Sequence, residues 1–317
     1  MQPEEKTIFR CKTADAYTIK MLFELLHNNI KTGCFELHKD GIQLCMTDSN
    51  RRTLIDVKIL SREMNFYLLQ PDHLRMGINV HHVYKMLRSV KKKDSMIMFI
   101  NESNPSDLGI QIIPKDQTRL TTSFVRIQNI QNLEIEVPNA YDSSVLVSSC
   151  EFAKMCKDML QMSQTIHIRS TRYNVRFTCN LGSVYSREVM LGETGFMNNN
   201  INIHEEQNIF DEDFDTEQLS RIIKIASLSS TMNVYCKQDY PLFIQTKIGM
   251  IGVISLYLKS KSQIEAESVN DRLHIVNIPG MNMNSTSMTS SMTSSISSTE
   301  REEETAIKIG TKGMIST

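Results

Sequence analysis

One amphipathic helical pattern occurs four times in this sequence at nearly equal intervals. Its first apolar residues are Ile19, Val83, Phe152 and Leu219, which are 64, 69 and 67 residues apart. In each copy apolar residues stand at i, i+3, i+4 and i+7, a spacing that places them on one face of an α-helix. The four stripes are Ile19, Leu22, Phe23 and Leu26; Val83, Met86, Leu87 and Val90; Phe152, Met155, Cys156 and Met159; Leu219, Ile222, Ile223 and Ala226. A unit that recurs at this interval predicts internally repeated structure.

Capping residues precede each stripe and predict where the helices begin. Ser148 and Glu151 have the S-x-x-E spacing of a capping box, in which each side chain bonds the other residue's backbone N–H. The predicted N-cap residues are Asp15, Asn79, Ser148 and Asp215, the last with Gln218 as its capping-box partner. We expect helices over residues 15–30, 79–93, 148–160 and 216–227, with the lysines at 91–93 closing the second.

Short strand-like segments separate these helices and predict an α+β architecture with antiparallel sheets. Residues 128–142 fit neither a helix nor a strand, because Pro138 interrupts them. We therefore predict an N-terminal domain over 1–127, a connector over 128–142 and a C-terminal domain over 143–265. Residues 285–299 contain twelve Ser or Thr, and such a segment cannot bury enough apolar surface to offset its ordering entropy. Residues 266–317 are predicted to form a disordered tail.

Composition excludes several classes of protein. The seven cysteines are odd in number, dispersed and without a C-x-x-C motif, which favours reduced thiols over a disulfide scaffold or a zinc site. No signal peptide opens the sequence and no apolar run approaches a membrane span. We expect a soluble intracellular protein with no membrane partner.

Catalytic chemistry has little support in the sequence. Asp211, Asp213 and Asp215 would share one side of a strand and could hold magnesium, but Asp215 is already expected to cap a helix. His81 and His82 are adjacent and point apart, which makes a poor metal pair. Phosphate-binding and nucleophile-elbow motifs are absent. We predict no catalytic residue, no metal and no cofactor.

Cations recur on the polar side of the repeated helices. Net charge is only −1, yet a nearly neutral protein can present a basic stripe. If the helices lie side by side, their cations form one band, composed of Lys20, Lys85, Arg88, Lys154, Lys157, Arg221 and Lys224. With no aromatic residues between them, these cations suit the phosphates of duplex DNA and sequence-independent binding.

Five collinear stretches carry a family resemblance. They are DGIQLCMTDSNRRTL (40–54), VYKMLRSVKKKDSM (83–96), CEFAKMCKDM (150–159), EQLSRIIKIASLSSTMNV (217–234) and DYPLFIQTKIGMIGVISLYL (239–258). The chain resembles the DNA sliding clamps of the proliferating cell nuclear antigen family from about residue 7 to residue 262, as a divergent, viral-type member. The Ser/Thr-rich tail has no counterpart in that family.

The resemblance implies a homotrimeric ring with four helices per subunit inside, facing duplex DNA, and antiparallel sheets outside. It implies a DNA polymerase processivity factor, active in replication and repair in the nucleus or at a cytoplasmic viral replication site. The seven cations above would face the DNA. Residues 118–127 and 183–191 would supply the strand edges that close the ring.

The resemblance also implies a pocket for short peptides of partner proteins. Expected partners are the polymerase, a clamp loader, a ligase and a flap endonuclease. The matching positions are Thr47, Arg51, Leu54, Val137, Pro138, Pro241, Tyr257 and Leu258. Thr47 stands where the family usually has methionine, and Arg51 where histidine is common.

Two alternatives remain open. The first is a monomeric processivity factor of the same fold that binds DNA by one basic face. The second is a metal-dependent nuclease that uses Asp211, Asp213 and Asp215.

Overall fold

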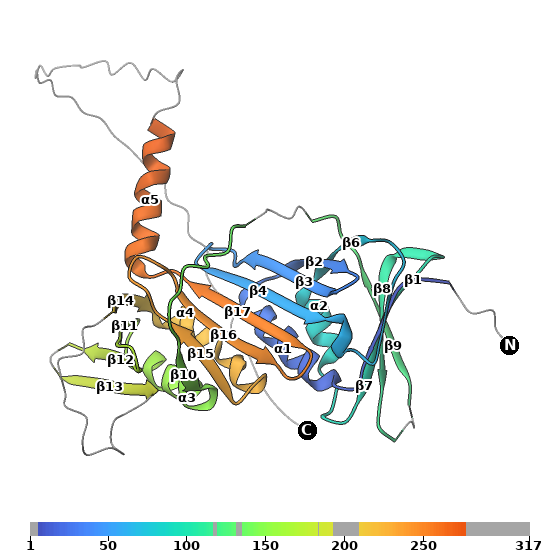
Figure 1. Ribbon diagram of the computed structural model, residues 1–317, viewed down its shortest axis with the longest axis horizontal. Coiled ribbons are helices and arrows are strands. Elements are labelled where there is room, and N and C mark those ends of the chain that lie inside the picture. Colours follow the sequence, from blue (N-terminus) through green and yellow to red (C-terminus); the bar gives the residue numbers. More distant parts are fainter. Residues whose placement is uncertain (1–5, 117–118, 131–134, 183, 193–208, 277–317) are drawn as a thin grey trace, which may run out of the picture. The chain divides into compact units, whose positions relative to one another are not determined.

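The computed structural model describes residues 6–116, 119–130, 135–182, 184–192 and 209–276 (Figure 1). The described residues up to Leu273 belong to one compact unit. The predicted Ser/Thr-rich segment at 285–299 lies outside the described residues. Among the described helices, none combines the length and apolar character needed to cross a membrane. All seven cysteines are free.

The four predicted helices are present, and each begins at its predicted cap. They are α1 Ala16–Asn29, α2 Val80–Leu87, α3 Ser149–Leu160 and α4 Thr216–Arg221. The side chains of Asp15, Asn79, Ser148 and Asp215 accept hydrogen bonds from the first backbone N–H groups of these helices. Each such bond satisfies a donor that the helix itself leaves unpaired.

In the two predicted capping boxes, the side chains of Glu151 and Gln218 bond to other partners instead of the backbone N–H of the N-cap residue. The Glu151 carboxylate accepts from Lys154 Nζ at 2.7 Å, and the Gln218 amide donates to the Arg52 carbonyl oxygen at 3.0 Å. The Lys154 ammonium competes for the Glu151 side chain, and the Arg52 backbone carbonyl competes for the Gln218 side chain.

Two predicted helix ends are wrong. Helix α2 ends at Leu87 with Arg88 as its C-cap, so the lysines at 91–93 lie beyond it. The predicted helix over 216–227 changes after Arg221 into the 3₁₀-helix η2, Ile223–Ser227. A 3₁₀-helix repeats every three residues, so the buried residues here are Leu219, Ile222 and Ile225, and Ile223 and Ala226 of the predicted stripe are only partly buried.

The strands form three antiparallel sheets. The five-stranded sheet has the order β5-β1-β7-β8-β9 and contains β1 Thr7–Thr13, β5 Phe66–Leu69, β7 Ser95–Asn101, β8 Asn104–Ile113 and β9 Thr121–Arg126. The four-stranded sheet has the order β13-β12-β11-β14 and contains β11 Thr165–Ser170, β12 Asn174–Leu181, β13 Tyr185–Gly192 and β14 Phe210–Asp215. Strands β7 and β8 are joined by a tight hairpin, in which Asn101 pairs with Asn104.

The eight-stranded sheet joins the two halves of the chain. Its order is β10-β15-β16-β17-β4-β3-β2-β6, with β2 Thr32–His38, β3 Gly41–Thr47, β4 Thr53–Leu60, β6 His73–Asn79, β10 Val145–Ser148, β15 Thr231–Tyr235, β16 Leu242–Ile248 and β17 Gly252–Leu258. Strands β17 and β4 pair along their length, from Gly252 opposite Ile59 to Leu258 opposite Thr53. A Cβ on Gly252 would lie 2.2 Å from the Lys58 carbonyl oxygen, so the close approach of these strands requires glycine there. The duplicated α+β fold of the prediction is confirmed.

Helices α1 to α4 and η2 form one row on one side of the eight-stranded sheet, and α5 stands apart from it (Figure 1). Helix α2 contacts α1, α1 contacts η2, and α3 contacts both α4 and η2. The predicted stripes of α1 and α3 are buried in the core between helices and sheet. Burial of these apolar side chains, each contributing about 1.5–3 kcal/mol, holds the helices in the row.

The C-terminal end differs from the predicted tail. Helix α5, Lys261–Val276, includes residues 266–276, for which the composition predicted disorder. A capping box begins it: the Ser260 N–H donates to Gln263 Oε1 at 3.0 Å, and the Gln263 N–H donates to Ser260 Oγ at 3.3 Å. The prediction weighed composition alone and overlooked this pair of residues, which stabilises a helix N-terminus.

Candidate nucleic-acid and partner interfaces

The row of helices carries all seven predicted cations, and three of them are exposed without a salt bridge in the described part of the chain. These are Lys85, Arg88 and Lys157. Lys85 and Arg88 lie on and just after α2, and Lys157 lies on α3. Their side chains can therefore meet a phosphate without first leaving an ion pair.

The Lys20 ammonium forms hydrogen bonds within the protein. Its Nζ donates to the carbonyl oxygens of Arg88 at 2.8 Å and Val90 at 3.0 Å. These carbonyls follow the last turn of α2, where helix ends leave acceptors unpaired. Lys20 thus ties α1 to the end of α2 and lies 5.6 Å from the centroid of the Tyr17 ring.

The other three cations form ion pairs on the helix surface. Lys154 Nζ lies 2.7 Å from Glu151 Oε1, Arg221 Nη2 lies 2.6 Å from Glu217 Oε1, and Lys224 Nζ lies 2.8 Å from Glu24 Oε1. The hydrogen bond to Glu151 raises the pKa of Lys154. Exposed ion pairs of this kind are weak, because solvent screens them, so these cations can exchange their carboxylates for phosphates.

A histidine cluster at the α1–α2 contact was not predicted as part of this surface. The His27 ring stacks on Tyr84 with centroids 4.8 Å apart, and His81 lies 4.5 Å from His27. Desolvation and then the charge of Lys85 lower the pKa of His81. This shift favours the neutral form of His81, and Lys85 and Arg88 carry the permanent charges of this region. The sequence signal was present, since His27 and His81 flank the predicted stripes.

Lys92 is a second residue that the sequence analysis missed. It was assigned to the end of α2, but it lies beyond that helix with its Nζ 6.0 Å from the Tyr17 centroid. It therefore extends the cationic surface next to Lys20.

The opposite face of the eight-stranded sheet carries a small aromatic cluster, made of Leu54 on β4, Phe243 on β16 and Tyr257 on β17. The Phe243 and Tyr257 rings stack with centroids 4.4 Å apart, and Tyr235 stacks on Phe243 at 4.5 Å. Burial, followed by the charge of Asp56, raises the pKa of Tyr257 to about 12. Phe243 and Tyr235 were missed by the prediction, although both occupy outward positions in the alternation of their strands.

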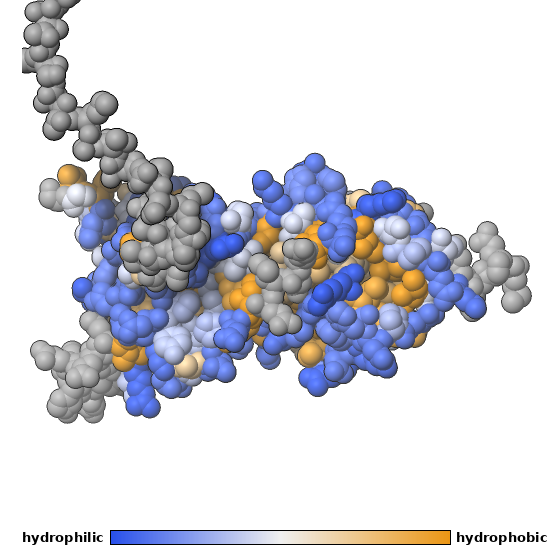
Figure 2. All heavy atoms as spheres, turned by 90° about the horizontal axis from the view of Figure 1, so that it is seen from above, coloured by the Kyte–Doolittle hydropathy of each residue, from blue (hydrophilic) through white to orange (hydrophobic). Residues whose placement is uncertain are grey.

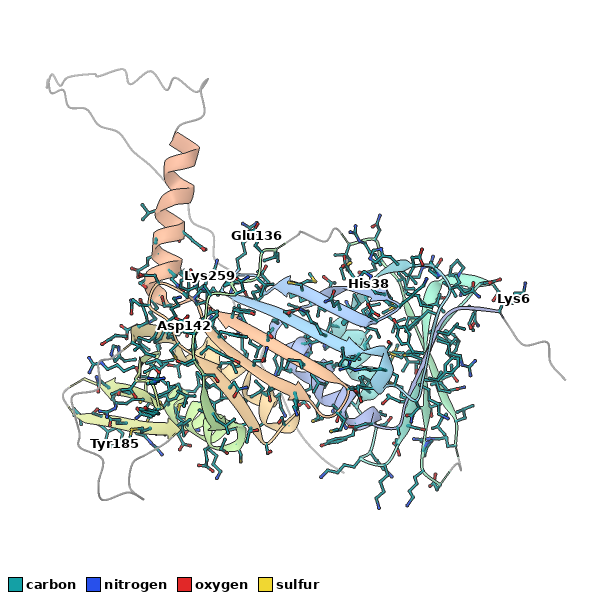
Figure 3. All side chains as sticks on the ribbon, viewed as in Figure 1. Lys6, His38, Glu136, Asp142, Tyr185 and Lys259 are labelled. Atoms are coloured by element: carbon teal, nitrogen blue, oxygen red, sulfur yellow. The ribbon has the colours of Figure 1, made fainter. Side chains whose placement is uncertain are left out.

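Tyr141 attaches the predicted connector to this cluster. Its ring lies 5.1 Å from that of Phe243, and its hydroxyl donates to the Pro241 carbonyl oxygen at 2.7 Å. Ile135 also packs against the cluster. Figure 3 labels Glu136 and Asp142 on this segment, which runs along the sheet near the C-terminal end of β17. Ile135 and Tyr141 of the connector thus cover the cluster, whose residues Leu54, Phe243 and Tyr257 are buried.

The structure brings part of the predicted pocket together: Leu54 is opposite Tyr257, and Pro241 is bonded to Tyr141 of the connector. Thr47 is opposite Leu54 in the β3–β4 ladder, and Val137 is 36% exposed on the connector. Pro138 and Pro241 are half-buried. Arg51 is exposed in the turn before β4, with φ of 56°. Leu258 is not part of this surface, because it points to the other side of β17 and is fully buried in the main core.

The acidic residues of the nuclease alternative lie on β14, on one side of the strand as predicted, but each has a protein partner. His167 lies between Asp211 and Asp213, at 2.9 and 2.8 Å from their carboxylate oxygens. Asp215 lies 3.3 Å from Arg52 Nη1 and caps α4. These contacts give the carboxylates structural roles.

The two strands expected to close a ring are at sheet edges. Strand β9 ends the five-stranded sheet and β13 ends the four-stranded one. Apolar side chains are exposed at both: Leu120 at 59% and Phe124 at 56% near β9, Val184 at 87% and Tyr185 at 50% near β13. On the side seen from above in Figure 2, hydrophobic residues likewise reach the surface between hydrophilic ones. Such edges invite pairing with another strand.

Comparison with known proteins agrees with this geometry. The family model of the N-terminal domain of proliferating cell nuclear antigen matches residues 8–135 of this chain. The family model of its C-terminal domain matches residues 136–261. The chain is 22% identical over 260 residues to "Probable DNA polymerase sliding clamp 1" of Paramecium bursaria Chlorella virus 1, covering 80% of this chain and 97% of that protein. The crystal structure of proliferating cellular nuclear antigen from Entamoeba histolytica superposes with a TM-score of 0.69 at 20% identity, covering 80% of this chain and 99% of that one. Because the two family models together span nearly all of the fold described above, the chain belongs to the proliferating cell nuclear antigen family.

Proposed function

We propose that three copies of this chain close into a ring around duplex DNA, with the helices facing the DNA. The protein is a DNA sliding clamp and a processivity factor for a DNA polymerase. The observation that carries the ring arrangement is the single row of helices, α2–α1–α4/η2–α3, whose cations lie opposite the buried stripes.

Contacts between the helices support one continuous DNA-facing surface. Lys20 connects α1 to the end of α2, and the ion pair of Lys224 with Glu24 connects η2 to α1. Long, flexible Lys and Arg side chains exchange phosphate contacts readily. A ring lined in this way retains DNA by topology and still slides.

Retention on circular DNA tests this function directly. Rings loaded on nicked circular plasmid are expected to stay bound through a high-salt wash and to escape once a restriction enzyme linearises the plasmid. High salt screens the phosphate contacts, so only topological linkage would remain. Equal release from circular and linear DNA would refute an encircling clamp.

The edges of β9 and β13 are the proposed contacts between neighbouring subunits. Pairing β9 of one chain with β13 of the next would satisfy both edges and would cover Leu120, Phe124, Val184 and Tyr185. A head-to-tail contact of this type closes into a ring when the rotation between subunits allows it.

Partner proteins are proposed to dock on the surface between the connector and the aromatic cluster. A polymerase, a clamp loader, a ligase and a flap endonuclease are the proposed partners, each through a short apolar peptide. The apolar cluster of Leu54, Phe243 and Tyr257 next to the connector supports this proposal, since aromatic anchors of a partner bind best at well-packed, desolvated sites.

Replacing Val137 by Asp is expected to weaken the binding of polymerase-derived peptides at least about tenfold, because a charge would be desolvated at the pocket rim. Fluorescence anisotropy with a labelled peptide measures the change. Val269→Asp is the matched control, since Val269 is exposed on α5 at 54%. Equal affinity of Val137→Asp and Val269→Asp would place the docking surface elsewhere.

Catalysis is not part of the proposal. The family is generally non-enzymatic, and the carboxylates of the nuclease alternative contact His167, Arg169 and Arg52. We propose that the clamp acts wherever its polymerase acts, in the nucleus or at a cytoplasmic viral replication site. The similarity to a clamp of a chlorella virus supports the viral setting.

A further inference from the structure

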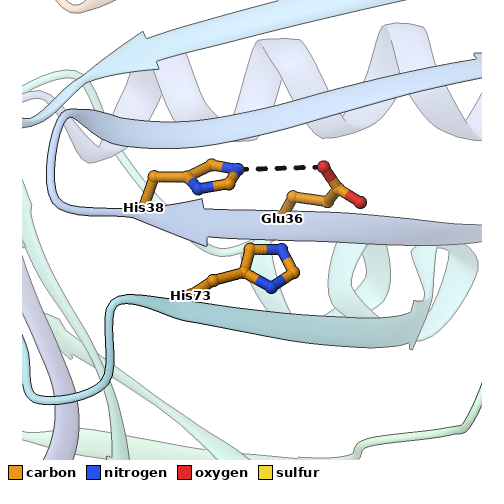
Figure 4. A group of neighbouring side chains, drawn as sticks. All are labelled: Glu36, His38 and His73. Carbon is orange, nitrogen blue, oxygen red and sulfur yellow. Dashed lines mark ion pairs between the residues drawn. The ribbon is translucent and has the colours of Figure 1, made fainter.

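Two histidines and a glutamate converge on the outer face of the eight-stranded sheet (Figure 4). They are His38 and Glu36 on β2 and His73 on β6, and their potential ligand atoms all lie within 4.8 Å of one another. In the described part of the chain no other three His, Cys, Asp or Glu side chains offer one ligand atom each that all lie within 4.8 Å of one another; around His167, Asp211 and Asp213 contact different ring nitrogens. Neither the DNA-facing helices nor the partner pocket includes them.

Strand geometry places these side chains together. His38 and His73 are directly opposite each other in the antiparallel β2–β6 ladder, so they point to the same face. Glu36 precedes His38 by two residues and shares that face, because side chains alternate along a strand. Phe35 and Leu37, which alternate with them, are buried on the helix side. The three polar groups therefore lie on the side away from the helices.

The distances are close to those of a tetrahedral metal site. Ligand atoms about 2.1 Å from a zinc ion in tetrahedral geometry lie roughly 3.4 Å apart. His38 Nε2 is 3.7 Å from Glu36 Oε2, and the centroids of His38 and His73 are 4.7 Å apart. Small side-chain rotations would bring all three ligand atoms onto one ion.

Neighbouring groups hold the ligands in position. Arg75 Nε lies 3.3 Å from Glu36 Oε1 and orients the carboxylate with its other oxygen towards His38. The Tyr67 hydroxyl donates to the carbonyl oxygens of His38 at 2.7 Å and Gly41 at 3.0 Å, which fixes the turn between β2 and β3. Supporting contacts of this kind raise metal affinity.

We propose that Glu36, His38 and His73 bind one divalent transition-metal ion of the zinc class. Two imidazoles and one carboxylate are the donor set of zinc sites that keep a fourth position open. Magnesium and calcium are disfavoured, because both prefer oxygen ligands. The open position faces solvent and can accept water or a donor group from a bound partner.

Isothermal titration of the full chain with zinc chloride tests this site. One zinc ion per chain is expected to bind. His73→Ala should weaken this binding by more than about tenfold. Substitutions of residues that only support the ligands commonly weaken metal binding by at least this much. Glu36→Gln should also weaken it, because the neutral amide is a poorer ligand. His73 is exposed, so its variant should keep the wild-type circular dichroism spectrum and the wild-type retention on circular DNA.

His81→Ala is the matched control. His81 and His27 have ring nitrogens 3.3 Å apart and form the competing histidine pair on the helix side of the molecule. The proposal requires unchanged zinc binding in His81→Ala. Zinc binding that survives in His73→Ala, that is lost in His81→Ala, or that is absent from the wild type would overturn it. None of these outcomes affects the clamp function, which retention on circular DNA reports separately.

Discussion

Phe124→Asp is expected to convert the proposed trimer to monomers. Phe124 is 56% exposed on the edge strand β9 and contacts Phe99 edge-on with centroids 6.1 Å apart. In the proposed ring its outer part would be covered by β13 of the next chain, so aspartate would place an unpaired charge in a closed contact. Such a charge costs about 3–5 kcal/mol, equivalent to a roughly hundredfold or greater decrease in affinity per interface.

Mass measurement in solution by light scattering shows the result. The wild type should have a mass of about 109 kDa, three times the chain mass of 36.4 kDa, and the variant should have the mass of one chain. Met250→Asp is the matched control, since Met250 is 81% exposed in the turn between β16 and β17, outside both proposed edges. A wild type that stays monomeric at micromolar concentration would instead favour the monomeric processivity factor.

Reversing the three exposed helix cations is expected to abolish most DNA binding while leaving the trimer intact. Lys85, Arg88 and Lys157 have no salt-bridge partner in the described residues, so their replacement removes phosphate contacts without releasing a carboxylate. Replacing all three by Glu should lower affinity for a short linear duplex at low salt by roughly a hundredfold or more. The slope of log affinity against log salt should become shallower by about 0.9 for each phosphate that is no longer neutralised.

The control carries the same change in net charge on a different surface. Lys58, Arg62 and Lys247 are exposed, and Lys58 and Lys247 both flank Val253 on the face of the sheet away from the helices. Replacing these three by Glu should leave the salt slope unchanged. If both triple variants show the same decrease in affinity, the effect comes from net charge, and the helix row is not the DNA-binding surface.

Local sequence signals predicted the helices well. Asp15, Asn79, Ser148 and Asp215 act as caps because capping depends on residues only two or three positions apart. The periodic stripes of α1 and α3 are buried for the same local reason. The change from α4 to η2 was missed, since both helix types accept apolar residues at i and i+3, and packing decides between them.

Long-range pairing could not be predicted in the same way. His38 and His73 are 35 residues apart and meet because of the β2–β6 register, which a single sequence does not specify. Likewise, Tyr141 reaches Phe243 across 102 residues because the connector lies over the sheet. The resemblance to a known family did identify Leu54 and Tyr257, but it also included Leu258, whose side chain faces the core.

The continuous ladder between β4 and β17 has a mechanical consequence. Seven consecutive residues on each strand are in register, and both halves also contribute helices to one packed row. Separating the two halves of one subunit would require the β4–β17 hydrogen bonds and the helix contacts to break together. An interface between two separate chains has no covalent link across it. Each subunit should therefore move as one rigid body. Duplex DNA would then enter the proposed ring through an opened interface between two subunits rather than by deformation of one subunit.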